Sequence, residues 1–201
     1  AAVAGVATFS GLSIDQAGAD KVLTASSTTL TTASTGAFTI TAGAPSSQQS
    51  TLSVDSASLV ADGTSTATLT ATVKDIQGNP VGGVSIFFTT DMGALSNGPW
   101  TTDSTGIATA TLSSITTGST TLRSYIGTGA NGTLIGTSTV SFTPGEAAKL
   151  AFITQPSAST VAGAEFAQQP VVEIQDAHGH RVTSSTDSVT VSLLSGTGTL
   201  A

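Results

Sequence analysis

Apolar and small polar residues alternate with a period of two along much of the chain. The alternation is clearest in five segments bounded by Gly, Asn, Asp or Pro: residues 5–14, 66–75, 83–91, 106–114 and 188–196. No longer stretch keeps a 3.6-residue period, so the pattern predicts strands and almost no helix. Thr and Val recur in these segments and favour strands, because β-branched side chains fit a pleated surface and lose rotamer freedom in a helix. Many short strands separated by frequent turns predict an all-β sandwich or barrel.

The chain also repeats itself at an interval of 101 to 102 residues. Three pairs of segments match: GVATF (5–9) with GIATA (106–110), FTITAGA (38–44) with VSFTPGE (140–146), and VKDIQGNPV (73–81) with IQDAHGHRV (174–182). The last match places Asp75 over Asp176 and Gly78 over Gly179. Self-similarity at a fixed period is typical of a tandem array of similar domains.

The repeat divides the chain into three parts. Residues 46–144 are predicted to be a complete unit, residues 1–45 the C-terminal half of another, and residues 145–201 the N-terminal half of the next. The two halves, of 45 and 57 residues, together have the length of one further unit. A direct join would leave five residues where the complete unit has ten, so we expect a few residues to be missing there. We expect the chain to be a window cut out of phase from an array; an arbitrary boundary within a longer chain is the alternative.

The complete unit resembles a bacterial immunoglobulin-like domain of the intimin/invasin type. The residues that carry the resemblance are ADGTSTATLTATVKD (61–75), GNPVGGVSIFF (78–88) and TDSTGIATATL (102–112). The resemblance is looser in both halves, and in residues 145–201 Ala162-Gly163 replaces the Asp62-Gly63 turn. It implies tandem immunoglobulin-like β-sandwich repeats of about 100 residues. It also implies a spacer in a repetitive surface protein whose binding activity lies in another, terminal domain; the motifs specify no ligand.

Composition narrows the classes of partner. The net charge is −7, and only five Lys and Arg are scattered along the chain, which argues against nucleic acid or anionic lipid. The chain contains no Cys, so it can form neither a disulfide nor a thiolate metal site. No apolar run approaches the ~20 residues of a transmembrane helix, and we expect no membrane insertion. No signal peptide is present, as expected of a mature segment or a piece of a longer chain.

The predicted joints between units are short. They read FTITAGAPSS at residues 38–47 and VSFTPGEAAK at residues 140–149, with Gly followed by small residues or one charge. Short Pro/Gly joints restrict the angle between neighbours more than a long Gly/Ser linker does, so we expect a semi-rigid rod. Residues 145–201 alone would leave an unpaired sheet edge, which residues 1–45 of a neighbouring copy could cover.

Two kinds of metal chemistry are conceivable. His178 and His180 stand beside Asp176 and could contribute to a metal site; an exposed β-turn, with Gly179 at positive φ, is the favoured interpretation. Oxygen ligands at turns and joints could bind Ca²⁺ weakly. The candidate ligands are Asp62, Asp75, Asp103, Glu146 and Asp176. These carboxylates are singly spaced and no DxDxDG loop exists, so solvated turn residues are the favoured interpretation, and no cofactor is expected.

Other functional motifs are sparse. No G-x-S-x-G elbow is present, and we expect no enzymatic activity. Trp100 and Tyr125 are the only Trp and Tyr, too few for a carbohydrate platform, and Trp100 is expected to pack at a sheet edge or joint. Asn131-Gly132-Thr133 is a glycosylation sequon or a hairpin turn.

The sequence therefore predicts a structural segment of a long extracellular fibre or cell-surface adhesin, with neighbouring repeats or copies as head-to-tail partners. A ligand- or carbohydrate-binding adhesin module, or an accessory domain of a large secreted hydrolase, is the alternative.

Overall fold

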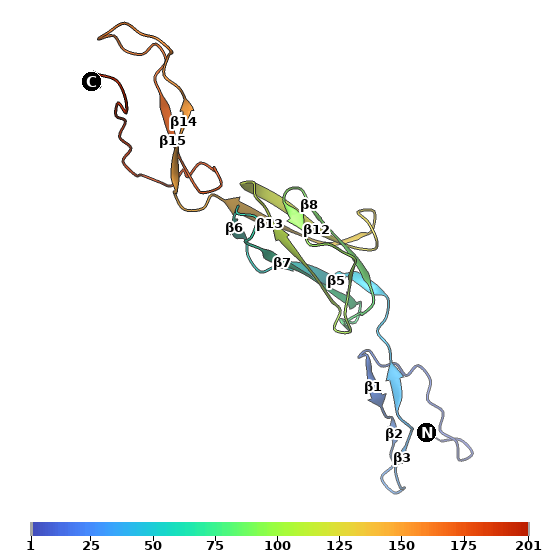
Figure 1. The fold of residues 1–201 in the computed structure, drawn as a ribbon. Coiled ribbons are helices and arrows are strands. Elements are labelled where there is room, and N and C mark those ends of the chain that lie inside the picture. The colour runs from blue at the N-terminus through green and yellow to red at the C-terminus, as the bar shows by residue number, and fades with distance from the viewer. Residues whose placement is uncertain (1, 201) are drawn as a thin grey trace.

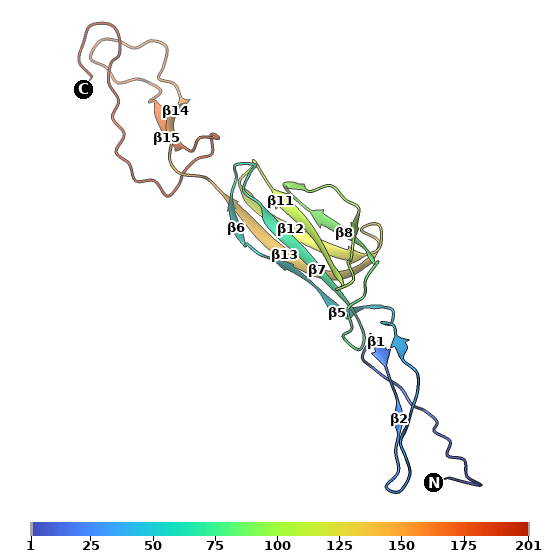
Figure 2. The same cartoon turned by 60° about the horizontal axis from the view of Figure 1, so that its bottom comes forward.

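The computed structural model describes residues 2–200. Within that range the protein consists of strands and turns and contains no helix, so the all-β prediction is confirmed. A central sandwich lies between two smaller hairpin regions, and the termini lie at opposite ends of an elongated molecule (Figure 1). The turned view in Figure 2 separates the same three parts. Among these residues, no helix suited to crossing a membrane is found.

The central sandwich has two sheets. The strands of its four-stranded sheet, in the order β5-β7-β11-β9, are β5 (Pro45–Val54), β7 (Ala67–Asp75), β11 (Ile107–Ser113) and β9 (Ala94–Leu95). The strands of its five-stranded sheet, in the order β10-β8-β12-β13-β6, are β10 (Trp100–Thr101), β8 (Ser85–Thr90), β12 (Gly118–Ile126), β13 (Thr133–Thr143) and β6 (Ser58–Val60). Neighbouring strands are antiparallel except β13 and β6, which pair in parallel. The predicted sandwich is confirmed for this unit.

The period-two pattern sets the faces of the sandwich. Along β7 every second residue is buried, and Leu69 and Val73 are fully enclosed. Leu122 and Val140 reach the same core from the opposite sheet. Full burial of one such side chain contributes about 1.5–3 kcal/mol, so these alternating positions hold the sheets together.

A bulge adapts β13 to this core. Ser124 pairs with Gly136 and Tyr125 with Leu134, so Ile135 is the extra residue, and it is buried. A Cβ added at Gly136 would lie 2.8 Å from Cβ of Leu52 on β5. Glycine is therefore required where β5 and β13 pass each other.

The flanking regions are hairpins. The N-terminal strands are β1 (Gly18–Lys21), β2 (Thr24–Ala25), β3 (Ala33–Ser34) and β4 (Phe38–Ile40). In these, β1 pairs with β4 and β2 with β3, at the repeat positions of β12 and β13. The C-terminal strands are β14 (Lys149–Thr154) and β15 (Val171–Gln175), which pair with each other at the repeat positions of β5 and β7. Each flanking hairpin therefore corresponds, by its position in the repeat, to two strands of the sandwich.

Two predicted strands are wrong. Residues 5–14 form no strand beyond an isolated bridge between Val3 and Val6, and residues 188–196 form none. At the repeat position of residues 5–14, β11 is held by β7 and β9. No such partner lies beside either segment within residues 2–200, and an extended chain without ladder hydrogen bonds is not a strand.

Truncation of a core leucine should unfold the sandwich more easily than truncation of an exposed one. Leu122→Ala leaves a cavity in a fully buried site and should lower the free energy of unfolding by about 2–5 kcal/mol in urea titrations. The matched control is Leu134→Ala on the paired strand, where Leu134 is 46% exposed; its effect should be about 0.5 kcal/mol. Equal losses for the two variants would contradict the assignment of the core.

Candidate functional site: two capped joints

Two densely hydrogen-bonded polar groups lie where the chain enters and leaves the sandwich. At the entry, Asp75 ends β7 and is 1% exposed. Its Oδ1 accepts hydrogen bonds from the backbone N–H of Gln77 (3.0 Å) and of Asn79 (2.8 Å). Gly78 has a φ of 87° and completes the turn. One carboxylate oxygen therefore fixes the turn itself.

The other oxygen of Asp75 holds the preceding linker. Oδ2 accepts a hydrogen bond from the backbone N–H of Gly43 at 2.8 Å and another from Nδ2 of Asn79 at 2.9 Å. The Asn79 amide also reaches the N-terminal region: Nδ2 donates to the carbonyl of Asp15 (2.8 Å), and Oδ1 accepts from the N–H of Ala17 (2.9 Å). We call the group Gly43, Asp75 and Asn79 the entry joint.

The same arrangement recurs one repeat later. Oδ1 of Asp176 accepts hydrogen bonds from the N–H of His178 (2.9 Å) and of His180 (2.8 Å), and Gly179 has a φ of 93°. Oδ2 accepts from the N–H of Gly145 at 2.9 Å. We call the group Gly145, Asp176 and His180 the exit joint. Each joint fixes the linker to the turn that follows it.

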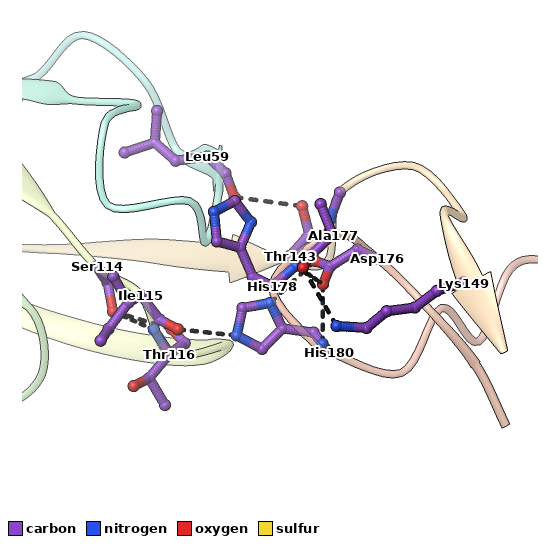
Figure 3. Close-up of polar contacts among 11 residues, drawn as sticks. Leu59, Ser114, Ile115, Thr116, Thr143, Lys149, Asp176, Ala177, His178 and His180 are labelled. Atoms are coloured by element: carbon purple, nitrogen blue, oxygen red, sulfur yellow. Dashed lines mark hydrogen bonds and ion pairs between the residues drawn. The ribbon is translucent and has the colours of Figure 1, made fainter. Parts of the chain in front are cut away.

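His180 completes the exit joint, as Figure 3 shows. Its Nδ1 lies 2.9 Å from Oδ2 of Asp176, and its Nε2 lies 2.8 Å from the carbonyl oxygen of Ile115. Ile115 belongs to the loop that follows β11 in the sandwich, so the ring bridges two regions of the chain. Nζ of Lys149 donates to the carbonyl of Ala177 (3.2 Å) beside it.

These contacts change the acidity of the joint residues. The side-chain amide of Asn79 and the N–H of Gly43 lower the pKa of Asp75, against its burial. Burial raises the pKa of Asp176, but the hydrogen bonds from Gly145 and His180 outweigh it, and the net pKa is far below the usual range. The bond to Asp176 raises the pKa of His180, against partial burial. Both carboxylates are therefore ionised in their joints near neutral pH.

The predicted calcium ligands are not brought together. Asp62 accepts from Thr64 and Ser65, and Asp103 accepts from Thr105 and Ile107, each within its own turn. Asp75 and Asp176 lie in different joints, and Glu146 follows Gly145 in the exit linker. Within residues 2–200 no three His, Asp or Glu side chains are placed to hold one metal ion. Weak calcium binding at these positions stays a prediction.

The histidine turn is partly as expected. Gly179 has the positive φ that the turn interpretation requires, but His180 is not a freely exposed turn residue, because its side chain is only 18% exposed and joins two regions. Sequence reasoning missed Asn79 altogether. The signal was present, since the repeat places Asn79 over His180.

The remaining candidates lie elsewhere. Trp100 packs at the sheet edge on β10, with its ring edge-on to Phe88 and the centroids 5.4 Å apart, as expected. Tyr125 lies within β12. In the sequon, Asn131 and Gly132 lie in the turn between β12 and β13, and Thr133 begins β13.

Comparisons with known proteins agree with this architecture. The sequence profile of the bacterial Ig-like domain (group 1) matches residues 49–143. The chain is similar to the structure of invasin, a bacterial integrin-binding protein, with 24% identity and a TM-score of 0.54 over 84% of this chain and 34% of that chain. It is also similar to FdeC, an Escherichia coli adhesin, with 24% identity and a TM-score of 0.51 over 74% of this chain and 47% of that chain.

A third similar structure is InvD of Yersinia pseudotuberculosis, with 23% identity and a TM-score of 0.51 over 73% of this chain and 47% of that chain. The chain thus spans about a third of the invasin structure and about half of the other two. At these identities the likeness establishes the fold. No curated protein matches the chain.

Removal of the charge on Asp75 should open the entry joint. In Asp75→Asn one acceptor oxygen becomes an NH₂ group that faces other donors, so the free energy of unfolding should fall by about 1.5–3 kcal/mol, and exchange of the Gly43 amide should accelerate. The control is Asp91→Asn, which removes the charge from an exposed 2.8 Å ion pair with Arg123 and should have a much smaller effect, because exposed ion pairs contribute little to stability. An unchanged Gly43 exchange rate in Asp75→Asn would contradict the role of the carboxylate.

Proposed function

Residues 49–143 are a bacterial Ig-like domain of group 1, and from that premise we propose that the chain is a structural, non-enzymatic segment of a long extracellular fibre or cell-surface adhesin. Its Ig-like domains follow one another head to tail and hold other parts of the protein at a distance from the cell. The observation that carries the proposal is the recurrence of one capped joint at both ends of the sandwich. A joint that recurs with the same donor and acceptor would give each pair of neighbouring domains the same orientation. A rod requires such a constant orientation.

The strand pairing suits a segment under tension. The chain enters through β5 and leaves through β13, in different sheets, and β13 is paired in parallel with the short β6. The N–H of Ser141 donates to the carbonyl of Ala57, and the N–H of Ala61 donates to that of Thr143, both at 2.9 Å. Tension along β13 loads these bonds together, so the sandwich should resist extension until they break as a group.

We also propose that the two flanking regions are complementary halves of one domain type: residues 1–45 the C-terminal half, residues 145–201 the N-terminal half, with 46–144 as the complete unit between them. The pairing of β1 with β4 and of β14 with β15 at the repeat positions of sandwich strands supports this. Exposed apolar side chains support it further, because Phe9 is 70% exposed, whereas Ala110 at its repeat position is 3% exposed.

Neighbouring repeats are the proposed partners. In the sandwich, β11 pairs with one edge of β7. By the repeat, β15 corresponds to β7 and residues 5–14 correspond to β11. The C-terminal half of one repeat would therefore complete the N-terminal half of another, either within a continuous chain or between separate copies, by strand addition. Sedimentation that shows an isolated monomer with protected terminal amides would count against pairing between separate copies.

A rejoined polypeptide tests the proposed halves. Residues 145–201 followed by a five-residue Gly/Ser spacer and residues 1–45 should fold cooperatively, because the apolar faces of both halves then enclose one core. The measurement is thermal unfolding by circular dichroism together with amide dispersion in NMR spectra. Residues 145–201 alone serve as the control and should show no cooperative transition. A rejoined chain that stays unfolded would overturn the division into halves.

Pulling on the 201-residue chain by its ends tests the mechanical function. Residues 46–144 should open in one step that releases ~350 Å of contour length, since an extended residue spans at most about 3.5 Å. Extension without a force peak would contradict a mechanical function. Specific retention of the chain on an array of glycans and matrix proteins would favour the alternative of a ligand-binding module.

A further inference from the structure

The two joints differ chemically at one position. Asp75 and Asp176 make the same contacts with their own turns and with the preceding linker glycines, Gly43 and Gly145. The fourth residue after each aspartate contacts the preceding region, and it is Asn79 in the entry joint but a histidine in the exit joint. An amide and an imidazole meet the hydrogen-bonding needs of equivalent partners in different ways.

Asn79 satisfies its neighbours without a charge. Its NH₂ group has two protons, one for Oδ2 of Asp75 and one for the carbonyl of Asp15, and its oxygen accepts from the N–H of Ala17. Every polar atom of the amide has a partner at 2.8–2.9 Å. No change of protonation of Asn79 is possible between pH 5 and 8, so the entry joint has one state there.

His180 can satisfy its neighbours only as a cation. Both ring nitrogens face oxygen atoms that can only accept: Oδ2 of Asp176 at 2.9 Å and the carbonyl of Ile115 at 2.8 Å. A neutral imidazole has one N–H, so one nitrogen lone pair would then face an oxygen lone pair. The imidazolium donates to both.

We propose that the exit joint is a proton-gated lock: His180 as an imidazolium fixes residues 145–201 to the sandwich, and loss of its proton opens that joint while the entry joint stays closed. Opening releases Ile115 and loosens the bond from the Gly145 N–H to the Asp176 oxygen that His180 also contacts. The inference concerns the joint itself and does not require that the protein is part of a fibre. It adds a control of stiffness that would act at one end of the sandwich and not at the other.

The charged groups around His180 come from several elements. On its own turn, Asp176 contacts the ring, and the His178 ring is stacked 6.3 Å away between centroids. From β14, Lys149 donates to the carbonyl of Ala177. In the linker, Glu146 is the carboxylate next to Gly145.

The sandwich presents mainly backbone to His180. The loop that carries Ile115 also holds Ser114 and Thr116, which bond to each other. Asp62 stands in the neighbouring loop, and both of its oxygens accept bonds within that loop. The direct ionic partner of the ring is therefore Asp176.

The direction of the pH effect follows from the cation. The hydrogen bond to Asp176 raises the pKa of His180 above its ordinary value of 6.5, with a further contribution from the carbonyl of Ile115 and against partial burial. The stabilisation of the lock is therefore fully present below about pH 6.5 and is lost as the pH rises through the higher pKa of the closed joint. Asp176 stays ionised over that range because its pKa is held well below the usual range, after its hydrogen bonds outweigh its burial.

Amide hydrogen exchange in the 201-residue chain tests the lock with an internal control. Gly145 and Gly43 donate to the two equivalent aspartates, so their protection factors, corrected for the intrinsic pH dependence of exchange, report the two joints in one sample. Between pH 5.5 and 8.5 the protection factor of Gly145 should fall, and that of Gly43 should stay constant. The expected fall is about tenfold for each pKa unit by which His180 in the closed joint exceeds His180 in the open joint. Parallel behaviour of the two glycines would overturn the proposal.

Reciprocal substitutions identify the responsible residue. His180→Asn gives the exit joint the residue of the entry joint and should make Gly145 protection independent of pH; Asn79→His should confer the pH dependence on Gly43. His178→Asn, on the same turn, should leave the response of Gly145 intact. If His180→Asn keeps the response, or His178→Asn removes it, His180 is not the gate. NMR titration of the His180 ring nitrogens in the unmodified chain gives a second readout that does not depend on the folding of any variant.

Discussion

A buried carboxylate that accepts hydrogen bonds from its own turn and from the preceding linker is the interaction on which the arrangement of this protein depends. Asp75 and Asp176 each use one oxygen for the turn and the other for the linker N–H of Gly43 or Gly145. Hydrogen bonds to a charged acceptor are roughly twice as strong as neutral ones, and burial excludes competing water. A single side chain therefore couples the folding of a turn to the orientation of the neighbouring region.

The sandwich and the joints have different chemistry, and this separates their roles. The core is closed by apolar alternation, and Leu69, Leu122 and Val140 are fully buried there. The joints are polar and depend on a few directed bonds. Non-directional burial tolerates small shifts of its parts, whereas directed bonds fix an angle. The sandwich can thus be stable by itself, while its relation to residues 145–201 depends on directed bonds such as those of His180.

The sequence predicts much of the fold and less of the joints, for a physical reason. Alternation identified β7, β8 and β11, because the core imposes period two on a paired strand. The same alternation misled at residues 5–14 and 188–196, because a pattern encodes which face is apolar and not whether a partner strand is present. The partners of Asp176 and His180 include the N–H of Gly145 and the carbonyl of Ile115, and backbone groups leave no signal in the sequence.

The placement of the joints at opposite poles of the sandwich has a consequence for its broad sides. Within residues 2–200 the flanking regions lie at the two ends of the sandwich, so the outward Thr and Ser residues of β11 and β13 face away from both joints. Substitutions at these exposed positions should change the outer surface and leave both joints intact. The exposed sides of the sandwich can therefore change in sequence while the geometry of the two joints stays the same.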